Sequence, residues 1–278
     1  MKVSFHVPVF TGEEKEHIDR VLKTKKISGD GQFTRRCEEI LENQTGCKKV
    51  LLTSSFAHAV EMSALLLNIG PGDEVIMSSF CSSSAANAFV LRGAKIVFVD
   101  IRPDTMNMNE ELLEEAVTEK TRVIVPFHYA GVACDMKQIL EVAEKYNLYV
   151  VENVDHGLMG KYFDDYLGTM GDLGVVGFHE GGSYACGQGG ALFINREDLV
   201  ERAEWIRDEG TNRKLMGEEI KGYSWVDIGS SYVLSELNAA YLYSQLGKSK
   251  ILYNRIKSWD SYYRGLKILE TEETIELP

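Results

Sequence analysis

The fold of this chain is indicated by residues 74–100, which read EVIMSSFCSSSAANAFVLRGAKIVFVD. Two short apolar runs, Glu74 to Ser78 and Lys95 to Asp100, have the length and the Val and Ile content of buried parallel strands. A helix-like segment from Ala85 to Arg92 lies between them, and Arg92-Gly93 supplies a turn before the second strand. Because parallel strands are joined by a crossover that is usually a helix, this stretch predicts a strand, helix, strand unit.

The same alternation continues on both sides of this unit. Further strands are predicted at Val50 to Thr53, Thr121 to Phe127, Leu148 to Glu152 and Leu192 to Ile194, and further helices at Ala57 to Leu67, Asn109 to Val117, Met136 to Tyr146, Leu199 to Arg207, Tyr232 to Leu246 and Ile251 to Leu266. Repeated units of this kind indicate an α/β fold with a mainly parallel sheet flanked by helices. We expect ligands beyond the carboxyl ends of the strands, as in other open α/β sheets.

Composition limits the possible functions. The chain has 278 residues, is 44% hydrophobic and carries a net charge of −12, which suits one large core and opposes nonspecific binding to nucleic acid or to anionic membranes. No uncharged apolar run reaches the ~18 residues of a membrane span, and the N-terminus lacks the apolar core of a signal peptide. The five cysteines are scattered without a CxxC pair, which favours reduced thiols and no metal site. We therefore expect a globular cytoplasmic protein.

Several motifs carry a resemblance to a known family. They are GDGQFTRRC (29–37), PGDEVIM (71–77), HYAG (128–131), GTNR (210–213) and DIGSSY (227–232). On these motifs the chain resembles the DegT/DnrJ/EryC1/StrS family of sugar-nucleotide aminotransferases, which depend on pyridoxal phosphate (PLP), and within it most closely the dTDP-4-amino-4,6-dideoxygalactose transaminases. The resemblance extends from the first residues to about Leu246.

The resemblance implies the type I fold of PLP transferases, which is the fold of aspartate aminotransferase. It assigns residues 1–246 to a large domain that includes the N-terminal arm, and residues 247–278 to the remnant of a truncated small C-terminal domain. It also implies a dimer in which Asn212 of one subunit lies near the cofactor of the other. The implied partner is a second copy of this chain or an active paralogue, and the implied ligand is a nucleotide sugar.

At the implied cofactor site, the chain departs from the family pattern. The lysine that holds PLP as a Schiff base corresponds to Gly182, which has no amine. The aspartate that keeps the pyridine nitrogen protonated corresponds to Asn153, which supplies no charge. The aromatic residue that stacks on the cofactor corresponds to Ser82, in a serine run that is typical of a helix cap. His156 stands where the family often has His or Gln near the cofactor.

The implied phosphate site is altered as well. A family threonine, at the start of the helix that begins near Phe56, corresponds to Ala57, and a family serine corresponds to Gly177. Ser183, which follows the lysine position, is a further candidate contact. The helix N-terminus still offers N–H groups and a partial positive charge to an anion. The implied cofactor is PLP or pyridoxamine phosphate (PMP), bound noncovalently at most.

Three interpretations follow. The main one is a degenerate homologue of a dTDP-4-keto-6-deoxyhexose aminotransferase that lacks transaminase activity alone and acts as a noncatalytic dimer partner. The second is a lysine-free enzyme that uses PLP or PMP on a nucleotide-linked 4-keto-6-deoxy sugar in polysaccharide biosynthesis, with His179 as the nearest candidate base. The third is a decaying copy without a selected role. Because Gly182 replaces the lysine, the sequence leaves open whether the chain is an enzyme.

Overall fold

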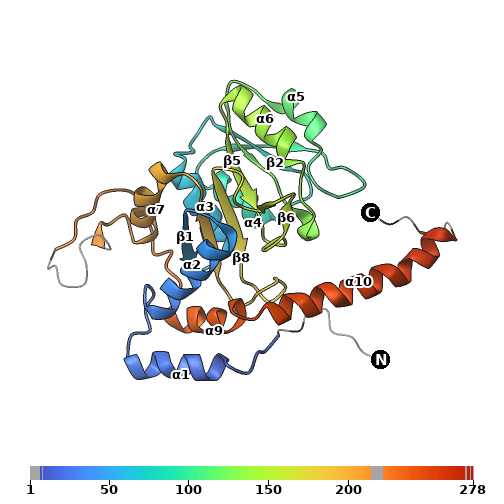
Figure 1. Ribbon diagram of the computed structural model, residues 1–278. Helices are drawn as coiled ribbons and strands as arrows, with labels where there is room; N and C mark the ends of the chain where they lie inside the picture. The colour runs from blue at the N-terminus through green and yellow to red at the C-terminus, as the bar shows by residue number, and fades with distance from the viewer. Residues whose placement is uncertain (1–6, 8, 214–221, 273, 276, 278) are drawn as a thin grey trace.

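A seven-stranded sheet forms the centre of the structure, a computed structural model that describes residues 7, 9–213, 222–272, 274–275 and 277 (Figure 1). The strand order is β1-β9-β8-β5-β4-β2-β3. These strands are β1 (Lys49–Thr53), β2 (Glu74–Ser78), β3 (Lys95–Val99), β4 (Thr121–Val125), β5 (Tyr149–Asn153), β8 (Leu173–Gly177) and β9 (Gly190–Ile194). Within this sheet β9 pairs antiparallel with β1 and β8, and the other pairings are parallel. The expected mainly parallel sheet is confirmed, and β6 (Lys161–Tyr162) and β7 (Asp165–Tyr166) form a separate hairpin.

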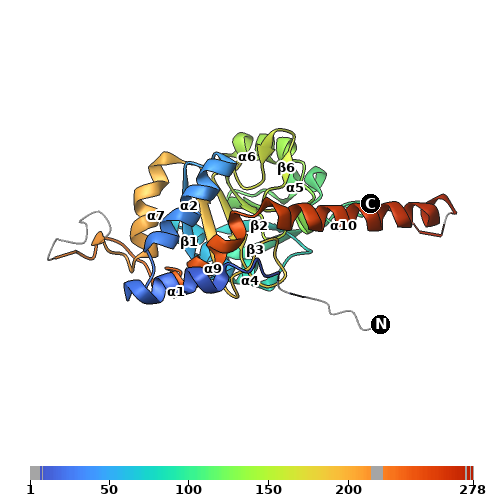
Figure 2. The ribbon, with the colours of Figure 1, turned by 60° about the horizontal axis from the view of Figure 1, so that its bottom comes forward.

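Helices lie on both faces of the sheet (Figures 1 and 2). They are α1 (Glu14–Thr24), α2 (Gln32–Thr45), α3 (Phe56–Leu66), α4 (Ser83–Val90), α5 (Leu113–Ala116), α6 (Met136–Tyr146), α7 (Val200–Arg207), α9 (Glu236–Leu246) and α10 (Ser249–Thr271). Short 3₁₀ helices are η1 (Glu110–Leu112), η2 (Tyr129–Gly131) and η3 (Glu197–Leu199). One core layer joins the sheet to α3, α4 and α7, whereas the opposite face packs against α2 and α9 in one part and against α5 and α6 in another.

Successive side chains of a strand point to opposite faces of the sheet, so each strand contributes to the core layers on both faces. In β1, Leu51 packs into the core layer of α3, while Val50 and Leu52 pack into the layer of α2 and α9. In β2, Val75 belongs to the first layer and Ile76 to the layer of α5 and α6. A strand that is covered on both faces needs apolar residues at consecutive positions, which is the pattern that made these strands recognisable in the sequence.

Two of the predicted helices differ from the observed ones. The segment expected to be one helix from Asn109 to Val117 is divided into η1 and α5. The helix expected from Tyr232 begins only at Glu236, because Ser235 has extended backbone and its hydroxyl accepts a hydrogen bond from the Asn238 N–H (3.3 Å). The remaining predicted helices lie within a few residues of the observed ones.

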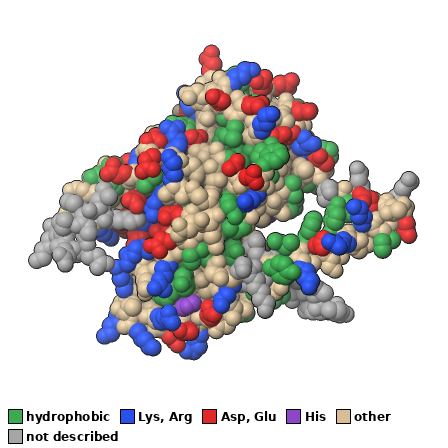
Figure 3. Space-filling view, viewed as in Figure 1, with side chains coloured by type: hydrophobic (Ala, Val, Ile, Leu, Met, Phe, Trp, Pro, Cys, Tyr) green, Lys and Arg blue, Asp and Glu red, His purple; other side chains and the backbone are tan. Residues whose placement is uncertain are grey.

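Helix α10 extends away from the body of the molecule (Figures 1 and 2). Hydrophobic side chains alternate with charged ones along its exposed length (Figure 3). Its exposed apolar residues include Tyr253, Ile256, Trp259 and Tyr262, which recur every three residues. Each lies next to the following one, but the row winds around the helix, so Tyr253 and Tyr262 lie on opposite sides. The predicted domain boundary at residue 246 lies between α9 and α10, and it stays a prediction. Among the described residues, no helix combines the length and the apolar character that crossing a membrane requires.

Candidate functional site

The carboxyl ends of β1, β2, β4, β5 and β8 meet at one edge of the sheet, where the sequence predicted the site. Gly190 closes this edge from the antiparallel strand β9, because it pairs with Thr53 on one side and with Gly177 on the other. A Cβ at Gly190 would lie only 2.5 Å from the carbonyl oxygen of Ser55. The absence of a side chain there lets the start of α3 approach the sheet.

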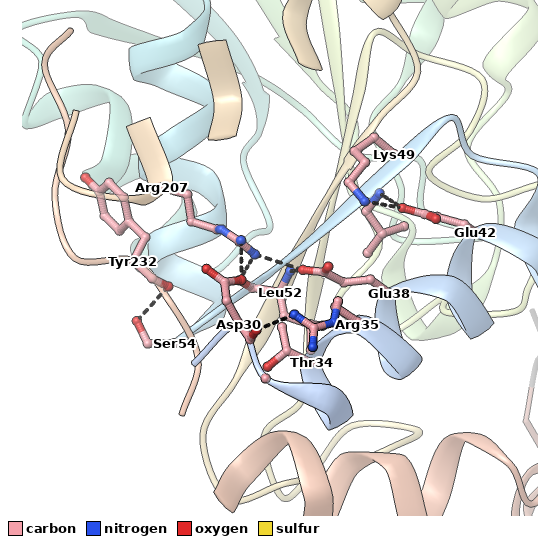
Figure 4. Close-up of polar contacts among 12 residues, drawn as sticks. Asp30, Thr34, Arg35, Glu38, Glu42, Lys49, Leu52, Ser54, Arg207 and Tyr232 are labelled. Atoms are coloured by element: carbon pink, nitrogen blue, oxygen red, sulfur yellow. Dashed lines mark hydrogen bonds and ion pairs between the residues drawn. The ribbon is translucent and has the colours of Figure 1, made fainter. Parts of the chain in front are cut away.

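Two buried ionic groups hold this edge in place. The first centres on Arg207 of α7, whose side chain has no exposed surface (Figure 4). Its Nη1 donates to Glu38 Oε1 at 2.8 Å, and its Nη2 donates to Asp30. The same Glu38 oxygen accepts the N–H of Leu52 at 3.0 Å. The group therefore ties α7 and α2 to the end of β1.

The second buried group joins β4 and β5. The N–H of Cys134 donates to Nδ1 of His128 at 3.1 Å, so the proton of the neutral ring lies on Nε2 and is donated to Glu152 Oε2, also at 3.1 Å. Glu152 also accepts three backbone N–H groups of the loop at 168–171. Both side chains are completely buried, so this histidine has a structural role.

Gly182, at the position that the resemblance assigns to the lysine, lies in a loop that hydrogen bonds hold in place. Its N–H donates to the carbonyl oxygen of His179 at 3.0 Å, and its own carbonyl oxygen accepts a hydrogen bond from Arg255 of α10. A Cβ at this position would lie 3.1 Å from the carbonyl oxygen of Tyr184 and 3.2 Å from that of His179. The position therefore has no amine and little room for a side chain. Ser183, the next residue, is half-buried.

Asn153 is the last residue of β5, one residue beyond the predicted end of the strand, and His156 follows the strand. Asn153 is 1% exposed, and its side-chain oxygen accepts the N–H of Asp155 at 3.1 Å. His156 is exposed, its Nδ1 accepts the N–H of Ala130 at 3.4 Å, and its ring contacts Tyr129 with centroids 5.7 Å apart. The amide oxygen of Asn153 is thus already used within its own loop.

The loop after β2 carries an aromatic ring at Phe80, and not at Ser82, which the resemblance assigns to the stacking aromatic residue. Ser82 is exposed and its hydroxyl lies 3.0 Å from that of Ser84. Ser82 occupies the N-cap position of α4, as the serine run suggested, but its side chain makes no capping hydrogen bond. Phe80, two residues earlier, contacts Tyr129 edge to face with centroids 5.0 Å apart. Phe80 thus belongs to an aromatic cluster with Phe127 and Tyr129, which follow β4, and His156, which follows β5.

The start of α3 is organised by its own serines. The hydroxyl of Ser55 accepts the N–H of His58 at 3.1 Å and caps the helix, and the hydroxyl of Ser54 lies 2.6 Å from His58 Nδ1. Phe56 is buried and Ala57 is half-buried at the first turn. The N-terminus of α3 lies at the carboxyl end of β1, where the site was predicted. The Ser55 hydroxyl accepts one of the N–H groups that this helix end would otherwise leave unpaired.

Asp155 and His179 form a hydrogen-bonded pair that the sequence analysis did not predict. His179 Nε2 lies 3.2 Å from both carboxylate oxygens of Asp155, and the N–H of Gly181 donates to Nδ1. The hydrogen bond to Asp155 raises the pKa of His179. A Cβ at Gly177 would lie only 2.0 Å from Asp155 Oδ1. The carboxylate therefore fills the space that a side chain at Gly177 would need.

Asn212 lies in a separate loop. Its N–H donates to the carbonyl oxygen of Ser224 at 3.2 Å, and its side-chain oxygen accepts the N–H of Ser224 at 2.8 Å. Thr211 and Trp225 form an adjacent bridge. Residues 214–221, which lie between Asn212 and Ser224 in the sequence, are outside the described part of the chain. The predicted contact of Asn212 with a partner's cofactor stays a prediction.

Comparison with known proteins establishes the family. The model of the DegT/DnrJ/EryC1/StrS aminotransferase family matches residues 8–278. The chain belongs to this family. A similar relative is the uncharacterized protein MJ1066 of Methanocaldococcus jannaschii, 33% identical over 247 residues, which cover 87% of this chain and 64% of the relative. The GDP-perosamine synthase of Caulobacter vibrioides is 29% identical over 245 residues, covering 88% and 64%. The chain thus spans a little under two thirds of both of these curated relatives.

Solved structures that are similar to this chain agree on the fold. The PMP form of the putative sugar aminotransferase Spr1654 from Streptococcus pneumoniae is 26% identical, covers 95% of this chain and 72% of its own, and has a TM-score of 0.89. The aminotransferase from Psychrobacter cryohalolentis is 28% identical, covers 88% and 64%, and has a TM-score of 0.82. The predicted type I fold of the PLP transferases is confirmed.

The residues of this site do not fit the PLP that family members hold through a lysine. Gly182 offers no amine for a Schiff base. At Gly177, where the family resemblance places a serine of the phosphate site, the adjacent space contains the carboxylate of Asp155. A carboxylate repels a phosphate at short range, and this one is only 14% exposed, so water screens it incompletely.

Proposed function

We propose that this chain is a homologue of the nucleotide-sugar aminotransferases that performs no transamination at its own site. Membership of the family and the similarity to a GDP-perosamine synthase support a role in nucleotide-sugar biosynthesis. The observation that carries the proposal is the combination of Gly182 with the Asp155–His179 pair. The first removes the covalent attachment of the cofactor, and the second places a carboxylate and an imidazole where phosphate contacts are implied.

The ancestral substrate under this proposal is a dTDP-linked 4-keto-6-deoxyhexose. A cavity of about 610 Å³ supports the proposal that this chain still binds a nucleotide-linked sugar. Lys248 and Arg255 line this cavity, and Arg255 also contacts Gly182. Two cationic side chains suit the diphosphate of a nucleotide sugar, because charge-assisted hydrogen bonds to phosphate are stronger than neutral ones.

The proposed role is that of a noncatalytic subunit in a cytoplasmic homodimer or in a heterodimer with an active paralogue. Exposed apolar side chains next to the Asn212 loop support a protein partner, since Trp225 is 81% exposed and Tyr223 is 55% exposed. The described cysteines are all free thiols, which suits a reducing compartment.

Binding and turnover test the proposal separately. The purified chain is titrated with PLP and with PMP while absorbance is followed, and turnover of an amino donor with a dTDP-4-keto sugar is assayed in parallel. We expect no aldimine band and no turnover. Gly182→Lys alone should restore neither activity nor tight PLP binding, because Asp155 remains in place.

Each other outcome has a definite meaning. Full rescue by Gly182→Lys would show that the Asp155–His179 pair does not obstruct the site. Tight PMP binding by the unaltered chain, followed by loss of water from a nucleotide-linked sugar, would favour the lysine-free enzyme instead. Failure to co-purify with any coexpressed paralogue, together with a monomer in sedimentation, would refute the role as a partner subunit.

A further inference from the structure

Helix α10 is the longest helix of the molecule, and it does not pack against the rest of the chain. It has 23 residues, from Ser249 to Thr271, and at 1.5 Å per residue it is about 35 Å long. In the described part of the chain, none of its residues belongs to a core cluster, and it has no extensive contact with another helix or strand. A helix gains most of its stability when an apolar face is packed, so we expect α10 to pack against a partner.

Four apolar side chains form a continuous stripe along α10, which we call the α10 seam. Ile256, Trp259, Tyr263 and Leu266 are spaced by three, four and three residues, which is the heptad spacing of paired helices. Ile256 is 59% exposed and Trp259 is 65% exposed, whereas Tyr263 and Leu266 are half-buried. The rings of Trp259 and Tyr263 stack with centroids 5.1 Å apart and an interplanar angle of 14°. The α10 seam is therefore an ordered apolar surface that faces solvent.

The size of the α10 seam suits a second copy of this chain. Aromatic side chains bury about 150–250 Å² each, and each copy supplies Trp259, Tyr263 and the flanking Tyr262, which is 70% exposed. Two seams packed together therefore bury on the order of 1,000 Å², to which Ile256 and Leu266 contribute further. A specific protein interface needs about 1,000 Å² or more.

The spacing of the seam and its flanking charges favour an antiparallel pair. When Trp259 of one copy packs beside Tyr263 of the other, Ile256 lies beside Leu266 of the other, so all four seam residues are covered. Asp260 flanks the seam and pairs with Arg264 of its own helix at 3.0 Å. In the antiparallel pair, Asp260 also faces Arg264 of the second copy. Two carboxylates and two guanidinium groups then lie together, and each carboxylate has a guanidinium from both helices.

The net charge of the chain favours the same direction. The chain carries −12, and a parallel pair would place both acidic bodies at the same end of the helices. In the antiparallel pair the bodies lie at opposite ends, about 35 Å apart, which is several times the Debye length of about 8 Å at physiological ionic strength. Salt then screens the repulsion between the two bodies.

We propose that α10 is a self-association surface, and that two copies of this chain pair antiparallel through their α10 seams. This surface is separate from the exposed loop beside Asn212, which supports a partner subunit in the proposed function. Pairing through α10 does not depend on the loss of transamination. A chain with both surfaces can bind a second copy through one of them and a different subunit through the other.

Sedimentation equilibrium of the full chain over a range of concentrations tests this pairing, and we expect reversible self-association. Trp259→Glu, which places a charge in the seam, should raise the dissociation constant at least about tenfold. Ile268→Glu is the matched control, because Ile268 is 64% exposed on the opposite side of α10, and it should leave the constant unchanged. Trp225→Glu, in the loop beside Asn212, should leave α10 pairing intact and so separates the two surfaces.

Two further sets of variants test whether the partner is a second copy and in which direction it lies. Arg264→Asp alone gathers four carboxylates beside the seam and should weaken pairing, whereas Asp260→Arg combined with Arg264→Asp should restore it. Under oxidising conditions, chains with Ile256→Cys and chains with Leu266→Cys should cross-link to each other when mixed, and neither should cross-link to itself. The unaltered chain controls for its own cysteines, which are buried or half-buried.

Circular dichroism checks that each variant keeps its helices. Because the substituted positions on α10 lie outside the core clusters, the body should stay folded in all of them. A monomer at every concentration, equal effects of Trp259→Glu and Ile268→Glu, or no restoration by the double charge exchange would overturn the proposal. Cross-linking of each cysteine variant to itself would overturn it as well, because that result belongs to a parallel pair.

Discussion

Replacing Gly177 with alanine tests the central claim that the Asp155 carboxylate fills the space beside the end of β8. Gly177 does not have a positive φ, so the backbone itself tolerates alanine. The added Cβ would lie 2.0 Å from Asp155 Oδ1 and 3.1 Å from His179 Cδ2, well inside normal contact distances. One of these side chains must therefore move.

Two responses are available, and both cost stability. If the surroundings stay in place, overpacking costs about 1–3 kcal/mol. If Asp155 turns away, the loss of its hydrogen bonds to His179 costs about 0.5–1.5 kcal/mol. We expect Gly177→Ala to lower the free energy of unfolding by about 1–3 kcal/mol, and each kcal/mol lowers Tm by about 2–4 °C for a chain near this size.

Urea unfolding followed by circular dichroism measures the loss, with Gly70→Ala as the matched control. Gly70 does not have a positive φ, and a Cβ there would meet nothing within 4 Å. The decisive comparison is a double-mutant cycle with Asp155→Ala, in which most of the cost of Gly177→Ala should disappear. Equal losses with and without Asp155, or a loss no larger than that of Gly70→Ala, would refute the reasoning.

Two further predictions concern the charged pairs. Asp155→Asn should lower the pKa of His179 toward its usual value, as measured by NMR titration, because the hydrogen bond to Asp155 is the main cause of the raised pKa. The stabilisation from this pair should be complete below about pH 6.5 and be lost as the pH rises through the folded pKa, and Asp155→Asn should remove that dependence; an unchanged pKa would contradict the assignment. Arg207→Met should lower the free energy of unfolding by about 3–5 kcal/mol, because it leaves buried Glu38 without its cation. The exposed-pair control Arg196→Met should cost no more than about 1 kcal/mol, and similar losses for the two variants would contradict the argument.

Much of the fold was predictable from local pattern. The strand before α4, β2, was recognisable because a strand covered on both faces needs consecutive apolar residues. The strand after α4, β3, carries a similar apolar run, but it lies at the edge of the sheet and its Phe98 is 57% exposed, so its expected burial was wrong. The antiparallel direction of β9 was not predicted, since strand direction depends on how the chain returns to the sheet and not on the composition of the strand. The late start of α9 depends on the extended backbone of Ser235, which its sequence position alone did not reveal.

The candidate site was also predictable only in part. Gly182 has no amine whatever the arrangement of the chain, so this part of the site follows from residue identity; that the position corresponds to the family lysine stays a prediction from the resemblance. The Asp155–His179 pair was missed, although Asp155 lies in the segment after β5 that was expected to face ligands. Its only signal in the sequence was a charged residue at a strand end, and such residues are commonly solvated.

The sequence by itself determined the α/β class, which depends on local periodicity, and the family, which its motifs indicate. It also determined that a glycine stands at position 182, where the family resemblance implies a lysine. Only the tertiary structure decided that Asp155 meets His179 and that Gly177 leaves room for that carboxylate. These contacts join residues from neighbouring strands and loops, and their distances depend on sheet register and side-chain packing. Register and packing arise only when the whole core is assembled.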